Sequence, residues 1–224
     1  MNPILTTHSG ANNQEENSQE YLNSCIGSSA KYIEVDIRKT SDNILVLSHD
    51  ANIKSKEIQE TCFSELKTLK PSLITINTAY EYAQKHNFFI NFDLKNIDAA
   101  PLLAKSIEEN KFTDKCVISG CHEEETKLLH NYNNKLKVIY NLEKDDIPKI
   151  DSVLEKLLSL KVYGINLNHK FLSKNLFNSL KKANLPIFVW TVDTNEEFDN
   201  CKNYEITSIT SNNPDLFDQK YSHK

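Results

Sequence analysis

Short apolar runs alternate with longer amphipathic segments along most of this chain, and this alternation limits the fold more than any other feature. Apolar runs of about five residues have the length of buried strands, and segments of about ten to fourteen residues have the spacing of one-sided helices. CVISG at 116–120, for example, is followed by HEEETKLLHNYN at 122–133. The pattern is typical of a parallel sheet in which each strand is followed by a helix.

The number of strand–helix units predicts a closed barrel. We count eight units when ILVLSHD at 44–50 is treated as an insertion after the second strand, YIEVDIR at 32–38. Eight units predict an α/β fold, a (β/α)8 TIM barrel with a small insertion after the second strand. An open doubly wound sheet is the alternative, but no G-x-G-x-x-G fingerprint follows a strand to support it. No linker interrupts the sequence, so we expect residues 1–224 to form a single domain.

The same alternation gives the expected elements. Strands are expected at 3–7, 32–38, 44–50, 88–95, 116–120, 136–142, 162–168, 186–193 and 206–210. The first helix is expected to run from a cap at Asn17 or Ser18 to Ile26. Further helices are expected at 62–70, 77–87, 96–111, 122–133, 147–160, 172–185, 195–203 and 213–220. DQKYSHK at 218–224 is expected to be frayed.

Composition and charge argue against several classes of protein. The net charge of −5 argues against a nucleic-acid-binding protein, which neutralises phosphates with Lys and Arg. The chain has no apolar run of about eighteen residues, so no transmembrane helix is expected. The N-terminus lacks the basic and long apolar regions of a signal peptide. The five cysteines are scattered without a C-x-x-C motif, which argues against a zinc site or a disulfide framework. A reducing cytoplasm is therefore the expected location.

Two carboxylates, Glu34 and Asp36, stand two residues apart in the second expected strand. Residues at this spacing point to the same face of a strand. Two buried acids on one face repel each other and lose hydration unless a positive group lies between them. A divalent cation with oxygen ligands is the group that best meets this need. Taken alone, the pair fits a solvated edge strand more often than a metal site.

Other polar residues fall at the ends of the expected strands. They are His8, His49, Asp93, Lys95, Ser119, Asn166, Asn168, Trp190 and Asp193. Active sites of TIM barrels lie where the strands end at their carboxyl side. Three carboxylates, two histidines and a lysine are therefore expected to converge on one rim. A solvated lysine and a core tryptophan remain the ordinary alternatives for Lys95 and Trp190.

The ordered motifs resemble the glycerophosphodiester phosphodiesterases. HSGANNQEENS is similar to the HRGA…PENT opening of that family, and the E-V-D of YIEVDIR and the SHD ending at Asp50 follow in the same order. FFINFDLK is similar to the family's I-N-I-E-x-K, FVWTVD to its V-W-T-V-N, and ITSITSNNPDLF to its closing strand and T-D-x-P turn. The resemblance runs from His8 to Phe217, which is nearly the whole chain.

The resemblance implies roles for individual residues. It implies a TIM barrel with a bound divalent cation, calcium or magnesium, on Glu34, Asp36 and Asp93. It assigns the acid–base pair to His8 and His49, a phosphate-facing cation to Lys95 and a wall of the glycerol pocket to Trp190. The ordinary pKa of histidine, about 6.5, suits both proton-transfer roles near neutral pH. The expected partner is a small-molecule glycerophosphodiester, and the oligomeric state stays open.

Two residues depart from the family pattern. Ser9 stands where the family has Arg, and a hydroxyl at this phosphate-binding position cannot replace a bidentate charged contact. Charge-assisted contacts contribute about 1.5–3 kcal/mol, so about ten- to hundredfold weaker phosphate binding or turnover is expected. Asp93 stands where the family more often has Glu, which draws the carboxylate back from the ion.

The predicted function is metal-dependent hydrolysis of glycerophosphodiesters to glycerol 3-phosphate and an alcohol. One alternative is a catalytically weak or inactive homologue that binds a phosphorylated ligand, which Ser9 motivates. A second is a related phosphodiesterase that acts on lysophospholipids, which an apolar groove beside Trp190 would favour.

Overall fold

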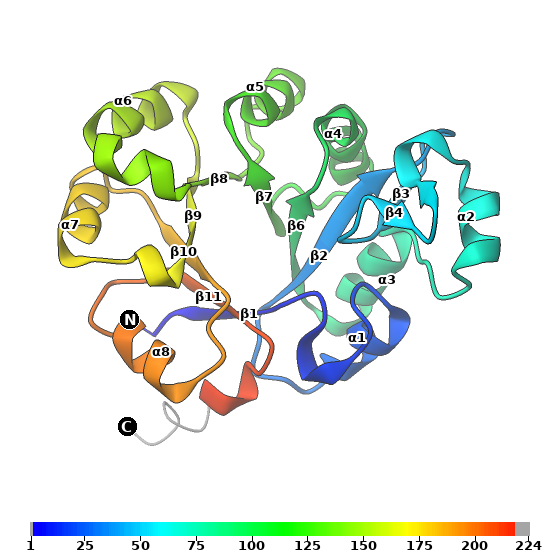
Figure 1. Ribbon diagram of the computed structural model, residues 1–224, viewed down its shortest axis with the longest axis horizontal. Coiled ribbons are helices and arrows are strands. Elements are labelled where there is room, and N and C mark those ends of the chain that lie inside the picture. Colours follow the sequence, from blue (N-terminus) through cyan, green and yellow to red (C-terminus); the bar gives the residue numbers. More distant parts are fainter. Residues whose placement is uncertain (1, 218–224) are drawn as a thin grey trace.

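A computed structural model describes residues 2–217, and within that range eight parallel strands form a closed ring. Strand β1 pairs with both β11 and β2, which closes the ring (Figure 1). The barrel strands are β1 (Ile4–Thr7), β2 (Tyr32–Lys39), β6 (Phe89–Leu94), β7 (Cys116–Cys121), β8 (Val138–Asn141), β9 (Gly164–Asn168), β10 (Ile187–Trp190) and β11 (Ser208–Ser211). The predicted (β/α)8 barrel is confirmed, and the open doubly wound sheet is wrong.

Helices surround the ring on its outer side (Figure 1). They are α1 (Gln19–Ser24), α3 (Ile76–His86), α4 (Ala100–Glu109), α5 (Glu123–Tyr132), α6 (Ile150–Leu160), α7 (Lys174–Lys182) and α8 (Asn195–Cys201). Short 3-10 turns precede or link several of them: η1 (Ala11–Asn13), η3 (Ile97–Ala99), η4 (Lys144–Lys149) and η5 (His169–Phe171). None of the helices within 2–217 is long and apolar enough to cross a bilayer.

Prolines set two helix starts. Pro101 lies in the first turn of α4, as expected, where its missing N–H costs nothing. The helix expected at 147–160 begins later, because Pro148 falls in the 3-10 turn η4 and α6 starts at Ile150. The expectations for DQKYSHK and for the end of the helix at 213–220 lie outside the described residues. The single domain over 1–224 stays a prediction.

The insertion after β2 forms a separate layer beside the ring (Figure 1). Strand β3 (Leu45–Leu47) pairs antiparallel with β2 and is followed by β4 (Asn52–Ile53), β5 (Lys56–Glu57), η2 (Ile58–Glu60) and α2 (Phe63–Leu69). Its buried residues make a small core of their own: Val46, Ile53, Ile58, Leu66 and Leu73. The predicted insertion is confirmed, although the β4–β5 hairpin is too short to leave a periodic signal.

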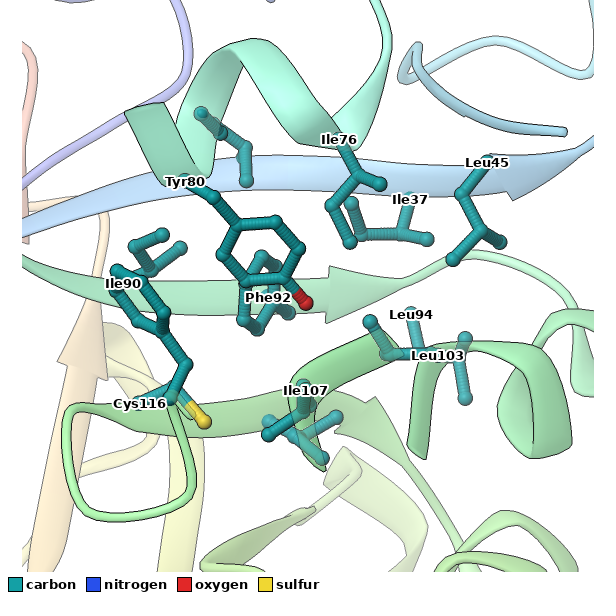
Figure 2. Close-up of a cluster of buried hydrophobic side chains, with 14 of the residues drawn as sticks. Ile37, Leu45, Ile76, Tyr80, Ile90, Phe92, Leu94, Leu103, Ile107 and Cys116 are labelled. Atoms are coloured by element: carbon teal, nitrogen blue, oxygen red, sulfur yellow. The ribbon is translucent and has the colours of Figure 1, made fainter. Parts of the chain in front are cut away.

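Alternate residues of each strand face opposite sides of the barrel wall. Ile37 of β2, with Ile90 and Phe92 of β6, packs outward against Ile76 and Tyr80 of α3 (Figure 2). The opposite parity points into the barrel. There Val117, Ile139 and Phe188 form a buried layer, and the half-buried Tyr32 packs against it. The inward-facing residues nearer the carboxyl ends of the strands are polar, and these residues form the site.

Candidate active site

A cavity of about 230 Å³ opens at the carboxyl ends of the barrel strands. Its walls include most of the residues expected at this rim: His8, Glu34, Asp36, His49, Asp93, Lys95, Ser119, Asn166 and Trp190. Trp190 ends β10, and its exposed fraction is 38%. Three expected residues, Ser9, Asn168 and Asp193, do not line this cavity. The barrel therefore brings together residues separated by most of the chain.

Glu34, Asp36 and Asp93 form a carboxylate cluster, each contributing one oxygen within 4.8 Å of the others. Strands β2 and β6 pair in register, which places Asp36 directly opposite Asp93. Glu34 and Asp36 are only 5% and 1% exposed, and β2 lies between β1 and β6 in the ring. The solvated edge-strand alternative for this pair is therefore wrong.

Lys95 lies between two of these acids. Its Nζ is 2.8 Å from Asp36 Oδ1 and donates a 2.6 Å hydrogen bond to Asp93 Oδ2, and its side chain is 20% exposed. Burial alone would lower the pKa of Lys95, but the charges of Asp93 and Asp36 raise it. The solvated alternative for this lysine is wrong, because its ammonium is held by the cluster.

The two carboxyls of β2 differ in their electrostatics. Burial and the nearby charges of Asp36 and Asp93 raise the pKa of Glu34 well above its usual range. Burial acts in the same sense on Asp36, but the charge and hydrogen bond of Lys95 outweigh it, so the pKa of Asp36 is lowered. A hydrogen bond from Asn17 acts in the same direction. The cluster thus holds a surplus of buried acid that a further cation would neutralise.

The geometry of this cluster fits a divalent cation. Calcium takes oxygen ligands at about 2.3–2.6 Å, so two ligands on opposite sides of the ion lie about 5 Å apart. The 4.8 Å span of the three carboxylates agrees with that spacing. All three are hard oxygen donors, which favours calcium or magnesium over softer metals.

Backbone and side-chain groups of the loop after β1 hold these acids in place. Asn17 clamps Asp36: its Nδ2 donates to Asp36 Oδ2 over 2.7 Å, and its Oδ1 accepts from the Asp36 N–H over 2.9 Å. Asn17 has a positive φ of 57°, which asparagine tolerates better than most residues. The cap of α1 is therefore Ser18, whose side chain accepts from the Tyr21 N–H.

Ser9 is fully buried and does not line the cavity. Its N–H donates to Glu34 Oε2 over 2.8 Å. Its hydroxyl makes no hydrogen bond of acceptable geometry, yet lies near enough to Asp36 to contribute weakly to the lowered pKa of that carboxyl. The backbone of Ser9 thus orients a carboxylate, while its side chain does not reach the cavity.

The two histidines enter the cavity from different elements. His8 directly follows β1, and its Nδ1 is 3.0 Å from Asn212 Oδ1. His49 follows β3 in the insertion, and its Nδ1 is 3.1 Å from Asp50 Oδ1. Arg38, at the end of β2, donates two hydrogen bonds of 3.0 and 2.8 Å to the His49 carbonyl oxygen. Arg38 therefore positions His49 and is not itself part of the cavity wall.

Sequence reasoning missed several wall residues, namely Asn91, Asn141, Thr191 and Thr210. Asn91 was open to the same argument as Asp93, since it lies two residues earlier on β6. Gly120 was also missed: it has a φ of 71°, and a Cβ there would collide with Asp93 and with the Leu94 backbone. The Gly120 N–H donates to Asn141 Oδ1 over 3.2 Å. Only glycine leaves room for Asp93 at this point.

Fold and site together define a class: a TIM-barrel enzyme with a carboxylate cluster, a lysine and two histidines at the carboxyl ends of its strands. The chain belongs to the glycerophosphoryl diester phosphodiesterase family, whose model matches residues 8–216. It is thus a phosphodiester hydrolase of the glycerophosphodiester phosphodiesterase type. A glycerophosphodiester phosphodiesterase of Bacillus altitudinis is 23% identical over 237 residues, 96% of each chain.

Solved structures share the fold. The glycerophosphodiester phosphodiesterase of Thermotoga maritima superposes with a TM-score of 0.84 at 22% identity, covering 98% of this chain and 99% of that one. A phosphodiesterase of Oleispira antarctica, solved in complex with the product sn-glycerol-3-phosphate, gives a TM-score of 0.83 at 18% identity, covering 98% and 97%. The resemblance read from the motifs is confirmed.

Proposed function

We propose that this protein hydrolyses glycerophosphodiesters to glycerol 3-phosphate and an alcohol, with a divalent cation and two histidines. The observation that carries the proposal is the convergence of three carboxylates, one lysine and two histidines around a single cavity. Glu34, Asp36 and Asp93 would hold calcium or magnesium. When bound there, the cation polarises the phosphoryl oxygens and offsets the negative charge of the diester.

The histidines and Lys95 supply the remaining chemistry. One histidine, His8 or His49, takes a proton from the attacking hydroxyl, and the other protonates the leaving alkoxide. Lys95 already faces the cavity and stabilises negative charge that grows on the phosphoryl group. The attacking hydroxyl belongs either to water or to the neighbouring carbon of the substrate.

The walls of the cavity favour a small polar substrate. Apart from Trp190, the lining residues are polar or charged. We propose that the ring of Trp190 packs against the carbon atoms of the glycerol group and forms one wall of its binding site. A second cavity of about 350 Å³ shares His49 and is lined largely by polar residues such as Glu16, Asn52 and Lys54, which gives room for a polar alcohol group. These walls do not favour the lysophospholipid alternative.

The test is release of glycerol 3-phosphate from glycerophosphocholine by the full chain with calcium or magnesium. We expect turnover that EDTA abolishes and that either cation restores. His8→Ala and His49→Ala should each lower kcat by about 10²–10⁴, the usual contribution of a positioned acid or base. Turnover that EDTA does not change would contradict the metal role.

The weak-homologue alternative is separated by the same assay. Failure to hydrolyse any glycerophosphodiester with any divalent cation, combined with binding of glycerol 3-phosphate, would favour it. Ser9→Arg is expected to raise activity if the missing arginine limits turnover. Because Ser9 is buried, the melting temperature of the Ser9→Arg variant must first show that the variant is folded. An unchanged or lower activity in a folded variant would show that Ser9 is not the limiting position.

The location remains the reducing cytoplasm in our proposal. All five cysteines, which lie within the described part of the chain, are free thiols. That state suits a compartment in which disulfides do not persist.

A further inference from the structure

Three side chains form a hydrogen-bonded line that ends at His8. His8 Nδ1 lies 3.0 Å from Asn212 Oδ1, and Asn212 Nδ2 donates to Asp193 Oδ2 over 2.8 Å. The other oxygen, Asp193 Oδ1, accepts from the Asn212 N–H over 2.7 Å and from Ser211 Oγ over 3.2 Å. Asp193 and Asn212 lie after β10 and β11, so this line is built only where the ring closes.

The direction of each bond follows from the chemistry of Asp193. A carboxylate oxygen accepts hydrogen bonds and does not donate them, so the Asn212 atom that faces Asp193 is the NH2 group. The Asn212 carbonyl oxygen then faces His8. Because that oxygen can only accept, His8 Nδ1 carries the proton of the bond. In the neutral imidazole the other nitrogen, Nε2, is left with a free lone pair.

We propose that Asp193 and Asn212 are positioning residues that fix His8 as the Nδ1–H tautomer and so leave Nε2 free to take a proton. This inference rests on the proposed acid–base role of His8. His8 lines the cavity, whereas Asp193 does not, and so Asp193 acts through Asn212. The His8 backbone N–H also donates to the Ser211 carbonyl oxygen over 2.9 Å, and this hydrogen bond keeps the imidazole of His8 beside Asn212 and Asp193.

Asp193→Asn should reverse the donor–acceptor direction of the hydrogen bonds that join residue 193, Asn212 and His8. The backbone N–H of Asn212 cannot turn, so the single carbonyl oxygen of the new amide stays opposite it. The new NH2 group then faces the Asn212 NH2 group, and two donors cannot pair. Asn212 relieves this by turning its carbonyl oxygen towards residue 193, which points its NH2 group at His8. His8 Nδ1 must then accept, and the proton moves to Nε2.

Exchanging the two residues should restore the line. In Asp193→Asn/Asn212→Asp the NH2 group at 193 donates to the new carboxylate at 212, and that carboxylate accepts from His8 Nδ1–H. The family motifs V-W-T-V-N and T-D-x-P carry the amide and the acid in this exchanged order, whereas this chain reads V-W-T-V-D and S-N-N-P. Asn212→Asp alone would place two carboxylates about 3 Å apart, where both cannot stay ionised.

The experiment compares wild type, Asp193→Asn, the exchanged double variant and a control, all with calcium present. Asp114→Asn is the control, since Asp114 is exposed and precedes β7 at the opposite end of the barrel. Two-dimensional 1H–15N correlation of the imidazole nitrogens, with the His8 signals identified by their loss in His8→Ala, reports the tautomer directly. Steady-state hydrolysis of glycerophosphocholine reports kcat and KM, and thermal melting reports folding.

Wild type and the control should show Nδ1–H at His8, and Asp193→Asn should show Nε2–H. We expect kcat of Asp193→Asn to fall about ten- to hundredfold with KM within about twofold, since proton transfer and not substrate binding is affected. The double variant should regain both the tautomer and most of kcat. An Nε2–H tautomer in wild type, or an unchanged tautomer in folded Asp193→Asn, overturns the inference. If wild type hydrolyses no diester, the proposed function fails, while the tautomer measurement still decides whether the line exists.

Discussion

At the scale of single residues, Lys95 contacts the carboxylate cluster that we propose as the metal site and also lines the cavity that we propose for the phosphate. Its ammonium pairs with both Asp36 and Asp93, offsetting part of their charge, while facing the cavity that would receive the phosphoryl group. We therefore expect the same lysine to compete with a divalent cation for the carboxylates and to assist that cation in turnover. Removal of the lysine should therefore change cation affinity and turnover in opposite directions.

Lys95→Met should tighten cation binding and slow the reaction. Removing a positive charge leaves the three carboxylates more negative, which favours a divalent ion. The loss of charge stabilisation at the phosphoryl group should lower kcat about 10²-fold. Calorimetry with calcium and the hydrolysis assay measure the two effects, with Lys127→Met on the exposed face of α5 as the control. Weaker calcium binding in the folded variant would contradict this account of Lys95.

We expect Glu34 to make the proposed cation binding depend on pH. Its pKa is raised in the folded, metal-free protein, so the folded state keeps a proton that the unfolded chain loses above about 4.5. The stability that this proton contributes is fully present below about 4.5 and is lost as the pH rises through the folded-state pKa. A cation needs the deprotonated carboxylate and stabilises the fold once that proton has left.

The rise in melting temperature caused by calcium should therefore grow between pH 5 and pH 8. Thermal melting in calcium and in EDTA across this range measures it. Glu34→Gln, which cannot ionise, should flatten the dependence. A calcium-induced rise that is constant or shrinks with pH in wild type would show that Glu34 does not exchange its proton for the ion.

At the scale of elements, strand β2 serves both the barrel and the insertion. Its inward residues Glu34 and Asp36 supply two of the three carboxylates of the cluster, and its last three residues, Ile37–Lys39, pair with β3 and include Arg38. The two hydrogen bonds from Arg38 hold the His49 carbonyl, so the insertion delivers a histidine to the rim of the barrel. Position of a reacting group to within about 1 Å has large effects on rate.

Arg38→Ala should lower kcat about tenfold and change the melting temperature little, because His49 loses its anchor while the core is untouched. Lys39→Ala is the matched control, since the half-buried Lys39 is the next residue of β2 and its Nζ donates to Asn43 Oδ1 over 3.3 Å. Kinetics and thermal melting of both variants decide the matter. If kcat falls equally in both, Arg38 has no special role in placing His49.

At the scale of the whole molecule, the packing of helices on the outer wall holds the site in place. Phe92 is fully buried and packs edge-on against Tyr80 of α3, with ring centroids 5.5 Å apart (Figure 2). Its neighbour Asp93 points the opposite way, into the cavity. Stability and chemistry thus alternate along a single strand.

Phe92→Ala should reduce the free energy of unfolding by about 3–5 kcal/mol, the usual cost of removing a buried aromatic ring. Urea denaturation measures this loss. Tyr132→Ala, at an aromatic residue that is 44% exposed on α5, should change it by less than about 0.5 kcal/mol. A loss below about 1 kcal/mol for Phe92→Ala would mean that this contact does not carry the packing we describe.

The chain by itself determined the periodic features. Its alternation fixed the order of strands and helices, because buried strands and one-sided helices need different apolar spacings. Its strand-end residues already pointed to Glu34, Asp36, Asp93, Lys95, His8 and His49, since parallel strands present their carboxyl ends on one side. Element boundaries such as the start of α6 were less well predicted, because they depend on local turn geometry.

The tertiary structure alone decided how these side chains meet. That Asn17 clamps Asp36, that Gly120 makes room for Asp93, and that Asp193 orients Asn212 against His8 all depend on contacts across the closed ring. Such contacts have no sequence period, because their partners are brought together by strand register and not by spacing along the chain. The sequence shows which residues have the chemistry that the site needs. Their mutual orientation is set only when the barrel closes.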